Sequence, residues 1–595
     1  MLSKIKNVIT SNASTSNNSS SAEAQETVSP PKIGMVVDMA GESNVFAEII
    51  SVMSGGPSPS ETHPQYSYTR PEFLHFSKEE TQLSADQLIR PVLCPKYALP
   101  VNAGYAEVIN HGKSVENEDM ATAKILNIVQ QGYEPEKAID LVKALKRTST
   151  QNSDIKFELL GNPFGQIKIK ENPRKLEKRR SDEDILTLHK SFSSDDEPTA
   201  PRAEAAYFAI FDGHAGSGAA IMASKMLHEH IKNRLSEVLE SILHLHRQET
   251  LFNSKNTSKN ERNCWNEDPT LEKNYQGEHR DKSVITADSL IVGALEAAFV
   301  EMDDRIGAEK AVSRLPGGCA AIVVLFFLNK IYVANAGDCR ALLVSPNKYL
   351  QLSTDFSPLK ERKRLQTIAY RNREVISNCF SRQEYSRFLT RKDLNHKVLY
   401  RDWYMDGWAA KTVREADLKP PLISTRCKKS RLLNTIGVSR GLGDHHLMTV
   451  DDRIAIKPFL SAHPEVQVFD TRSMDCLSSS DVLVVGSDGL WDVFSNEDVF
   501  NIVNTSMSTL NSCESTGTES IDLEDDSIKY TYTLMAQELA AGARGDPVDN
   551  SKWRLSGGAM ASSDDITVFV IPLKFAVNLC AEDSTEDDDE ELLVA

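Results

Sequence analysis

Acidic residues stand at the ends of apolar runs at four places in this chain. The runs are aliphatic and β-branched and are bounded by Gly, Asp, Asn or Pro, which is typical of buried strands. Carboxylates at such ends, with Gly or Ser beside them, supply the oxygen ligands that Mg²⁺ and Mn²⁺ prefer. The acidic positions are Asp212 after residues 207–211, Asp338 after 332–337, Asp488 after 482–487, and Asp564 with Asp565 before 566–570. The pattern indicates a shared site for a hard divalent cation.

The same aspartates have a simpler interpretation. Asp-Gly is a common turn dipeptide, and any one of these aspartates is more often a turn or cap residue than a metal ligand. Four such positions shift the balance toward a metal site, yet periodicity alone leaves the two interpretations about equal. Thiolates do not compete for the assignment, because the nine cysteines are scattered and include no C-x-x-C pair.

Composition excludes several classes of protein. The chain has 595 residues and a net charge of −18, which argues against a nucleic-acid partner because phosphate neutralisation needs clustered positive charge. The longest apolar run, 320–328, is less than half as long as a bilayer-spanning helix. The odd number of cysteines and the absence of a signal-peptide pattern predict a reduced, cytoplasmic protein. The sequence does not indicate an oligomeric state.

We expect both ends of the chain to be disordered. Residues 1–95 are mostly polar and without sustained periodicity, and residues 576–595 form an acidic tail with eight acidic residues between 582 and 591. Within Met1–Thr10, apolar residues recur three or four apart with lysines between them. This segment is either a basic amphipathic helix on a membrane surface or a frayed terminus. The first interpretation predicts peripheral contact with Golgi or vesicle membranes.

Between these ends, residues 96–575 are expected to form one folded domain. Helical periodicity predicts helices over 218–243 and 290–306, and polar composition predicts loops near 148–202 and 246–282. Strands and helices occur in runs without a regular βαβ period. This order favours an α+β sandwich over a doubly wound parallel sheet.

Six motifs in order resemble the metal-dependent protein serine/threonine phosphatases of type 2C. They are Asn117-Glu118-Asp119, Phe211-Asp212-Gly213-His214, Ala336-Gly337-Asp338-Cys339-Arg340, and the segments 438–444, 487–492 and 562–568. Longer matches at 104–110, 212–220 and 435–445 are similar to one animal subgroup of the family. The resemblance implies a central sandwich of two antiparallel β-sheets flanked by helices, with the metal ions in a cleft at one end.

The resemblance also implies a set of metal ligands for two Mg²⁺ or Mn²⁺ ions and a third, weaker ion. Gly213 corresponds to the residue that offers a backbone carbonyl. Asp119 corresponds to a residue that supports the ligands through hydrogen bonds, and Asp338 to the carboxylate that helps to bind the third ion. The implied side-chain ligands are Glu118, Asp212, Asp488 and Asp564.

The implied reaction is hydrolysis of a phosphate monoester without a covalent phosphoenzyme. Two divalent ions lower the pKa of a bridging water and hold it in line with phosphorus, so Asp212 and Asp488 are catalytic through the ions that they hold. His214 follows Asp212-Gly213 directly and is placed to give a proton to the leaving oxygen. The alternative for His214 is a packed or capping histidine.

Two positions depart from the family pattern. Many members carry an arginine four residues before the metal-binding glutamate, where this chain has Ser114 with Lys113 beside it. Lys113 is the candidate for gripping substrate phosphate, although a lysine lacks the bidentate geometry of arginine. Asp565 stands where Asn is usual, so it either tunes metal affinity or sits behind the ligands.

A long insert at 353–434 occupies the place of the family's variable flap. Residues 359–431 contain 19 Lys/Arg against 8 Asp/Glu, with aromatic residues at Tyr400, Trp403, Tyr404 and Trp408. Such a surface would attract and anchor a folded phosphoprotein. The alternative is a solvated charged face with the aromatic rings packed beneath it. The resemblance to the animal subgroup suggests phosphorylated Rab-type small GTPases as substrates.

Two rivals to an active phosphatase remain. The first is a pseudophosphatase that binds phosphoproteins without turnover, although such a relative would be expected to have lost a ligand. The second is another two-metal hydrolase such as a nuclease, which the acidic composition disfavours.

Overall fold

A computed structural model describes residues 66–131, 200–256, 285–425, 429–474, 476–514, 524–549 and 552–578. Several of the expected features lie outside these residues: the segment 1–10, most of the loops 148–202 and 246–282, and the acidic tail from 579 onward. Their interpretations stay predictions. No helix among the described residues is both long and apolar enough to cross a membrane.

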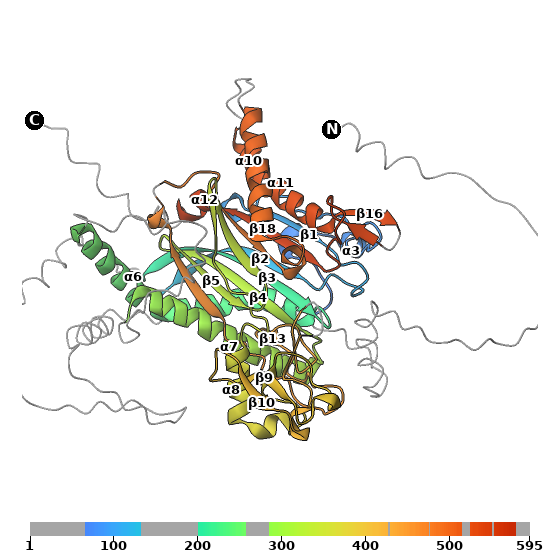
Figure 1. Ribbon diagram of the computed structural model, residues 1–595. Helices are drawn as coiled ribbons and strands as arrows, with labels where there is room; N and C mark the ends of the chain where they lie inside the picture. The colour runs from blue at the N-terminus through green and yellow to red at the C-terminus, as the bar shows by residue number, and fades with distance from the viewer. Residues whose placement is uncertain are drawn as a thin grey trace, which may run out of the picture. The chain divides into compact units, whose positions relative to one another are not determined.

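Two antiparallel sheets form the centre of the fold (Figure 1). The first has the order β14-β5-β4-β3-β2, with the short β13 (Leu442–Gly443) paired to β4. Its strands are β2 (Met120–Val129), β3 (Arg202–His214), β4 (Gly318–Phe327), β5 (Lys330–Ala336) and β14 (Glu465–Asp470). The second has the order β1-β18-β15-β6-β7, made of β1 (Gly104–Val108), β6 (Arg340–Ser345), β7 (Lys348–Gln351), β15 (Val482–Gly486) and β18 (Ile566–Pro572). The expected α+β sandwich is confirmed.

Strand β3 shows how the sequence builds both layers at once. Successive side chains of a strand point to opposite faces of the sheet. Phe208 and Ile210 join the apolar cluster between the two sheets, where the Phe208 ring lies 5.5 Å from that of Phe569 in the opposite sheet. Tyr207, Ala209 and Phe211 instead join the cluster beneath the helices. Because both faces of this strand are buried, its sequence is continuously apolar rather than alternating.

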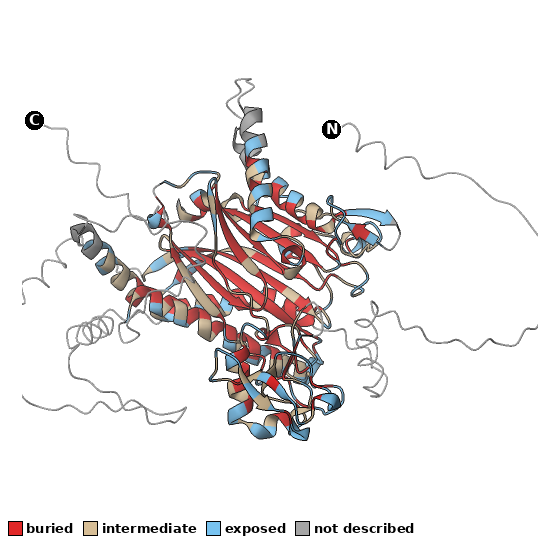
Figure 2. Ribbon diagram, viewed as in Figure 1, coloured by how far each residue is buried: buried red, intermediate tan, exposed pale blue. Residues whose placement is uncertain are grey.

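Helices cover the outer face of each sheet (Figures 1 and 2). The first pair is α6 (Gly218–Asn256) and α7 (Ala287–Ser313), and the second is α10 (Asn496–Glu514) and α11 (Glu524–Arg544). Both of the expected helices are present and both are longer than periodicity predicted. The expectation of a loop from residue 246 is wrong for 246–256, which continue α6. Polar side chains do not stop a helix that contains no Pro or Gly at this point.

The expected boundary at residue 96 is too late. Residues 66–95 include η1 (Glu72–Leu74) and α3 (Lys78–Leu83), and Leu74 is buried between the sheets. Arg70 is buried and donates two 2.8 Å hydrogen bonds to the carboxylate of Glu107 on β1. A long-range buried pair leaves no periodic signal in the sequence.

The insert folds into a small layer of its own. It contains α8 (Arg362–Arg371), a sheet of order β10-β9-β8 made of Ala409–Thr412, Lys397–Arg401 and Glu384–Tyr385, and the pair β11 (Ile423–Ser424) and β12 (Arg431–Leu432). Its apolar cluster joins Leu365 and Phe380 to Ile456 and Phe459. The packed flap therefore extends past the expected limit at residue 434, because residues up to 460 complete its core. We use "flap" below for residues 353–460 except β13, which pairs with β4 in the first sheet.

Candidate metal centre

Three of the predicted aspartates meet where strands of the two sheets end. Asp212 lies in β3 and Asp338 comes two residues after β5, and both strands belong to the first sheet. Asp488 comes two residues after β15 of the second sheet and begins the short helix α9 (Asp488–Trp491). One carboxylate oxygen of each lies within 4.8 Å of the others. The backbone N–H of Asp488 also donates to Asp212 Oδ2 over 3.2 Å, which links the two sheets directly. The grouping that periodicity left open as turn residues is therefore a cluster of carboxylates.

Glu118 and Gly213 lie beside this cluster. Gly213 approaches the Glu118 backbone so closely that a Cβ on it would lie 2.2 Å from the Glu118 carbonyl oxygen, so no larger residue fits without movement. Glu118 Oε1 accepts a 2.6 Å hydrogen bond from the N–H of Gly216. Asp119 points elsewhere: its Oδ2 accepts from the Thr567 hydroxyl over 2.7 Å. Its implied support of the metal ligands stays a prediction.

Asp564 and Asp565 have different surroundings. The Lys113 ammonium donates to Asp564 Oδ2, which places the candidate phosphate-gripping lysine at the edge of the carboxylate cluster. Asp565 is buried, and its two oxygens accept from the backbone N–H groups of Asn110 and Glu118 over 2.7 and 3.1 Å. Asp565 thus sits behind Glu118 and orients it. Burial and the adjacent Asp564 carboxylate raise the pKa of Asp565 to about 7.

The donor set fits hard divalent cations. Asp488 Oδ1 is a buried oxygen with no hydrogen-bond partner among the described residues, which is unfavourable unless a cation satisfies it. Burial, together with the negative charge of Asp488, raises the pKa of Asp212 well above its ordinary value and that of Asp338 to about 7. Carboxylates that repel one another in this way gain most from a bound Mg²⁺ or Mn²⁺ ion.

His214 has a partner that the sequence did not point to. Its Nε2 lies 2.7 Å from Oδ2 of Asp444, a buried residue at the end of the 438–444 motif. Burial alone would lower the pKa of His214, but the Asp444 carboxylate outweighs burial and raises it above 6.5. The protonated imidazole is therefore favoured, as a proton donor requires. The signal for Asp444 was its place in a motif shared with the family, but nothing in the spacing linked it to His214.

Lys429 is a second residue at this centre that sequence analysis missed. It comes from the flap, between β11 and β12, and its Nζ donates to Asp488 Oδ2 over 2.5 Å and lies 2.8 Å from Asp492 Oδ2. Burial lowers the pKa of Lys429, but Asp488 and Asp338 outweigh burial and raise it. In the sequence Lys429 is one of 19 basic residues between 359 and 431, so no local feature distinguished it.

Comparison with known proteins identifies the class to which this site belongs. The protein phosphatase 2C family model matches residues 271–371 and 420–528. Relatives that are 36–37% identical over 90% of this chain are named protein phosphatases, and the chain belongs to this family of metal-dependent protein serine/threonine phosphatases.

Two named groups of relatives are similar over their full length. Protein phosphatase 1H of Danio rerio is 36% identical over 567 residues, covering 90% of this chain and 97% of the relative. The Homo sapiens protein phosphatase 1H is 37% identical over 561 residues, with 90% and 96% covered. Protein phosphatase 1J of Rattus norvegicus is 34% identical over 576 residues, with 96% and 97% covered. The similarity therefore extends over most of this chain, whereas the family model leaves out residues 372–419 of the flap.

Proposed function

We propose that this phosphatase hydrolyses phosphoserine and phosphothreonine with a water activated between two Mg²⁺ or Mn²⁺ ions. The proposed ligands are the carboxylates of Glu118, Asp212, Asp488 and Asp564 and the carbonyl of Gly213. The observation that carries the proposal is the convergence of Asp212, Asp338 and Asp488 with a buried, unpartnered oxygen on Asp488. When bound, the ions neutralise charge and supply the nucleophile at neutral pH.

The remaining steps belong to side chains of this chain. His214, held by Asp444, gives its proton to the departing serine or threonine oxygen, which is a poor leaving group as an alkoxide. Lys113 is exposed at the rim beside Asp564 and offers a point charge to the substrate phosphate. Asp338 assists with a third, weaker ion, as the family resemblance implies.

An assay with and without metal tests this function. Mg²⁺ or Mn²⁺ should support release of phosphate from phosphothreonine peptides, and chelator should abolish it. Phosphopeptide binding without turnover at any metal concentration would instead favour the pseudophosphatase.

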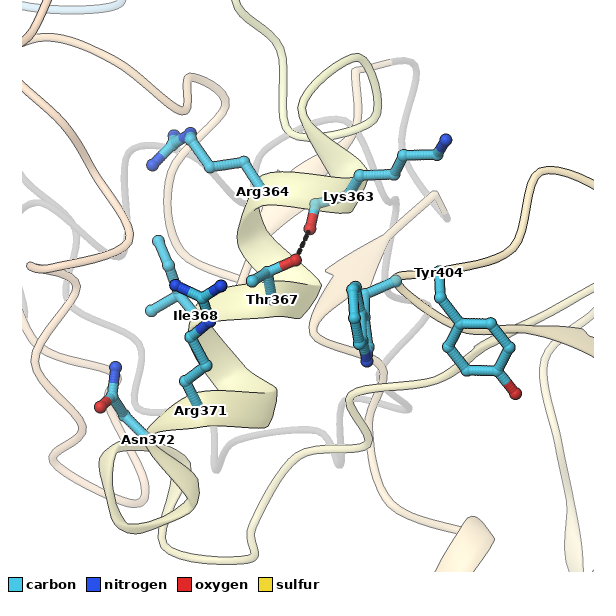
Figure 3. Close-up of a pocket in the computed structure, with 8 residues that line it drawn as sticks. Lys363, Arg364, Thr367, Ile368, Arg371, Asn372 and Tyr404 are labelled. Carbon is cyan, nitrogen blue, oxygen red and sulfur yellow. Dashed lines mark hydrogen bonds between the residues drawn. The ribbon is translucent and has the colours of Figure 1, made fainter. Parts of the chain in front are cut away.

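We further propose that the flap binds the phosphoprotein substrate. A cavity of about 740 Å³ lies between α8 and the loop after β9 (Figure 3), and both basic and aromatic residues line it. Tyr404 is 63% exposed and Trp408 is 42% exposed, which supports a binding surface rather than rings packed beneath a charged face. The cavity is lined by Lys363, Arg364, Thr367, Ile368, Arg371, Asn372, Trp403 and Tyr404. Exposed aromatic and arginine side chains are the residues that most often anchor protein partners.

Phosphorylated Rab-type small GTPases are our proposed substrates, on the strength of the resemblance to the animal subgroup. Arg371→Glu and Trp403→Ala should raise KM for a phosphorylated Rab protein and leave kcat/KM for a small aryl phosphate unchanged. A matched control is Arg314→Glu, at the exposed end of α7. Equal KM values for the flap variants and the control would exclude docking at this cavity.

We keep a third proposal for the amphipathic segment. Residues 1–10 would bring the enzyme to an anionic membrane surface, such as that of the Golgi or of vesicles. Flotation of the full chain and of a variant with Leu2, Ile5 and Val8 changed to Asp, with anionic liposomes, would test this contact. Equal flotation of the two would contradict it.

A further inference from the structure

Lys429 joins the flap to the carboxylate cluster. It lies five residues after β11 and two before β12, and β12 contributes Leu432 to the flap core. At its other end the ammonium contacts two carboxylates, Asp488 over 2.5 Å and Asp492 over 2.8 Å. The packing of the flap therefore sets the position of Lys429, and Lys429 contacts Asp488, which we assign to the metal centre.

The two oxygens of Asp488 have different surroundings. Oδ2 accepts from Lys429, whereas Oδ1 is buried and has no partner among the described residues. The side chain of Asp488 is only 16% exposed, so the contact is more than a surface ion pair, which would contribute little. Oδ2, with Lys429 bound to it, marks one corner of the site, and Oδ1 stays free to ligate an ion.

Three carboxylates line that corner: Asp338, Asp488 and Asp492. Asp338 offers an oxygen within 4.8 Å of one oxygen of Asp488, and its charge interacts with those of Lys429 and Asp492. Lys429 bridges Asp488 and Asp492. Three carboxylates around one small volume either take up protons or bind a cation. An ammonium group and a divalent ion cannot both occupy the same pair of oxygens, because each needs the same lone pairs and the two repel each other.

We propose that Lys429 is a tethered cation that competes with a divalent ion for the corner formed by Asp338, Asp488 and Asp492. The inference rests on the proposed function in one respect, namely that Asp488 is a metal ligand. Lys429 weakens binding of a further ion at this corner and leaves Oδ1 of Asp488 free for another ion. When a divalent ion fills the corner, Lys429 leaves the carboxylates and residues 429–430 of the flap shift away from the centre.

Metal binding measures this competition without relying on turnover. Binding of Mn²⁺ to the full chain is followed by the electron paramagnetic resonance of the free ion, for wild type and for Lys429→Met, Lys429→Gln and Lys429→Arg. The neutral variants should bind one weak Mn²⁺ ion at least about tenfold more tightly, a change of about 1.4 kcal/mol. Lys429→Arg should resemble wild type, because it keeps the charge.

Two controls make the result specific. Lys360→Met removes another half-exposed lysine of the flap, which lies 4.0 Å from Asp355, and should leave every Mn²⁺ affinity unchanged. The double variant Lys429→Met/Asp338→Asn should not bind the weak Mn²⁺ ion more tightly than wild type, because it lacks the carboxylate charge of Asp338. Unchanged Mn²⁺ binding in both neutral variants, or a gain that survives the loss of Asp338, would overturn the inference.

A chemical readout follows the lysine itself. Acylation of Lys429, measured by mass spectrometry, should rise as Mn²⁺ fills the weak site, whereas acylation of Lys360 should stay constant. Constant acylation of Lys429 over that range would also overturn the inference. Failure of the proposed function has a different signature, since wild type and all variants would then bind no Mn²⁺ at the two tighter sites.

Discussion

His214 and Asp444 are 230 residues apart in sequence, and their Nε2 and Oδ2 atoms lie 2.7 Å apart. Asp444 is 4% exposed, so its charge is poorly screened by water and acts mainly on the imidazole. The pair has the arrangement of a general acid with a carboxylate that orients it and keeps it protonated.

His214→Ala should slow esters with poor leaving groups most. We expect kcat to fall about 100-fold or more on a phosphothreonine peptide, in the range typical of a lost general acid, and much less on an activated aryl phosphate. Asp444→Asn should show the same pattern more weakly. Equal losses on both substrates would remove His214 from the role of proton donor.

Asp212→Asn should abolish turnover and yet raise thermal stability in chelator. Burial and neighbouring carboxylates raise the pKa of Asp212, so at neutral pH its ionised form destabilises the metal-free fold, and Asn removes that charge. Melting temperatures of wild type and Asp212→Asn, measured in EDTA and in Mn²⁺, test this prediction. Added Mn²⁺ should stabilise wild type much more than the variant, and a variant less stable than wild type in EDTA would contradict the explanation.

Asp338→Ala should retain phosphoprotein while turning it over slowly. Lys113 contacts Asp564, not Asp338, so contacts made to the bound substrate should survive, whereas those needed only in the transition state are lost. The measurement pairs kcat with a pull-down from phosphatase-inhibited lysate. If this variant turned over its substrate as fast as wild type, Asp338 would have no role in catalysis and would only be a turn residue.

Arg70→Met should destabilise the protein and impair the metal centre together. Besides its two bonds to Glu107, Arg70 donates to the carbonyls of Asn117 and Asp119 over 3.0 and 2.9 Å, on either side of Glu118. Among the described residues, the Glu107 carboxylate would keep only the hydrogen bond from the Tyr105 hydroxyl, and a buried carboxylate that loses its cation costs about 3–5 kcal/mol. The control is Lys96→Met, which removes an exposed pair with Glu80. Denaturant unfolding should separate the two variants, and equal midpoints would show that the N-terminal segment does not hold the site.

Glu361→Gln should loosen the base of the flap in a pH-dependent way. Burial raises the pKa of Glu361, but bonds from Arg364 and Arg440 outweigh it, so the pKa in the folded state lies below its ordinary value. Its stabilising effect is therefore present above the unfolded pKa of about 4.3 and is lost as pH falls through the lower folded value. We expect the free energy of unfolding of wild type to be about 1–3 kcal/mol larger than that of the variant at pH 7. The difference in melting temperature should shrink below about pH 4, and a constant difference down to pH 3 would refute this explanation.

Much of the site could be predicted because it is built at strand ends. Continuous apolar runs identify strands that are buried on both faces, such as β3, β5 and β15. A carboxylate next to such a run lies near the end of the strand. Periodicity alone could not separate ligands from turn residues, since both require the same Asp-Gly sequence. The ordered motifs supplied what periodicity lacked.

The sequence by itself determined the sandwich, the helices and the acidic strand ends, because these follow from local patterns of apolar and polar residues. Only the tertiary structure decided which charges meet. Arg70 reaches Glu107, Asp444 reaches His214, and Lys429 reaches Asp488 across separations of 37, 230 and 59 residues. Such contacts depend on how whole elements pack, and a buried ion pair places no periodic constraint on the residues around it. The carboxylates of the metal centre could therefore be predicted from the sequence. The side chains that pair with them could be identified only from the tertiary structure.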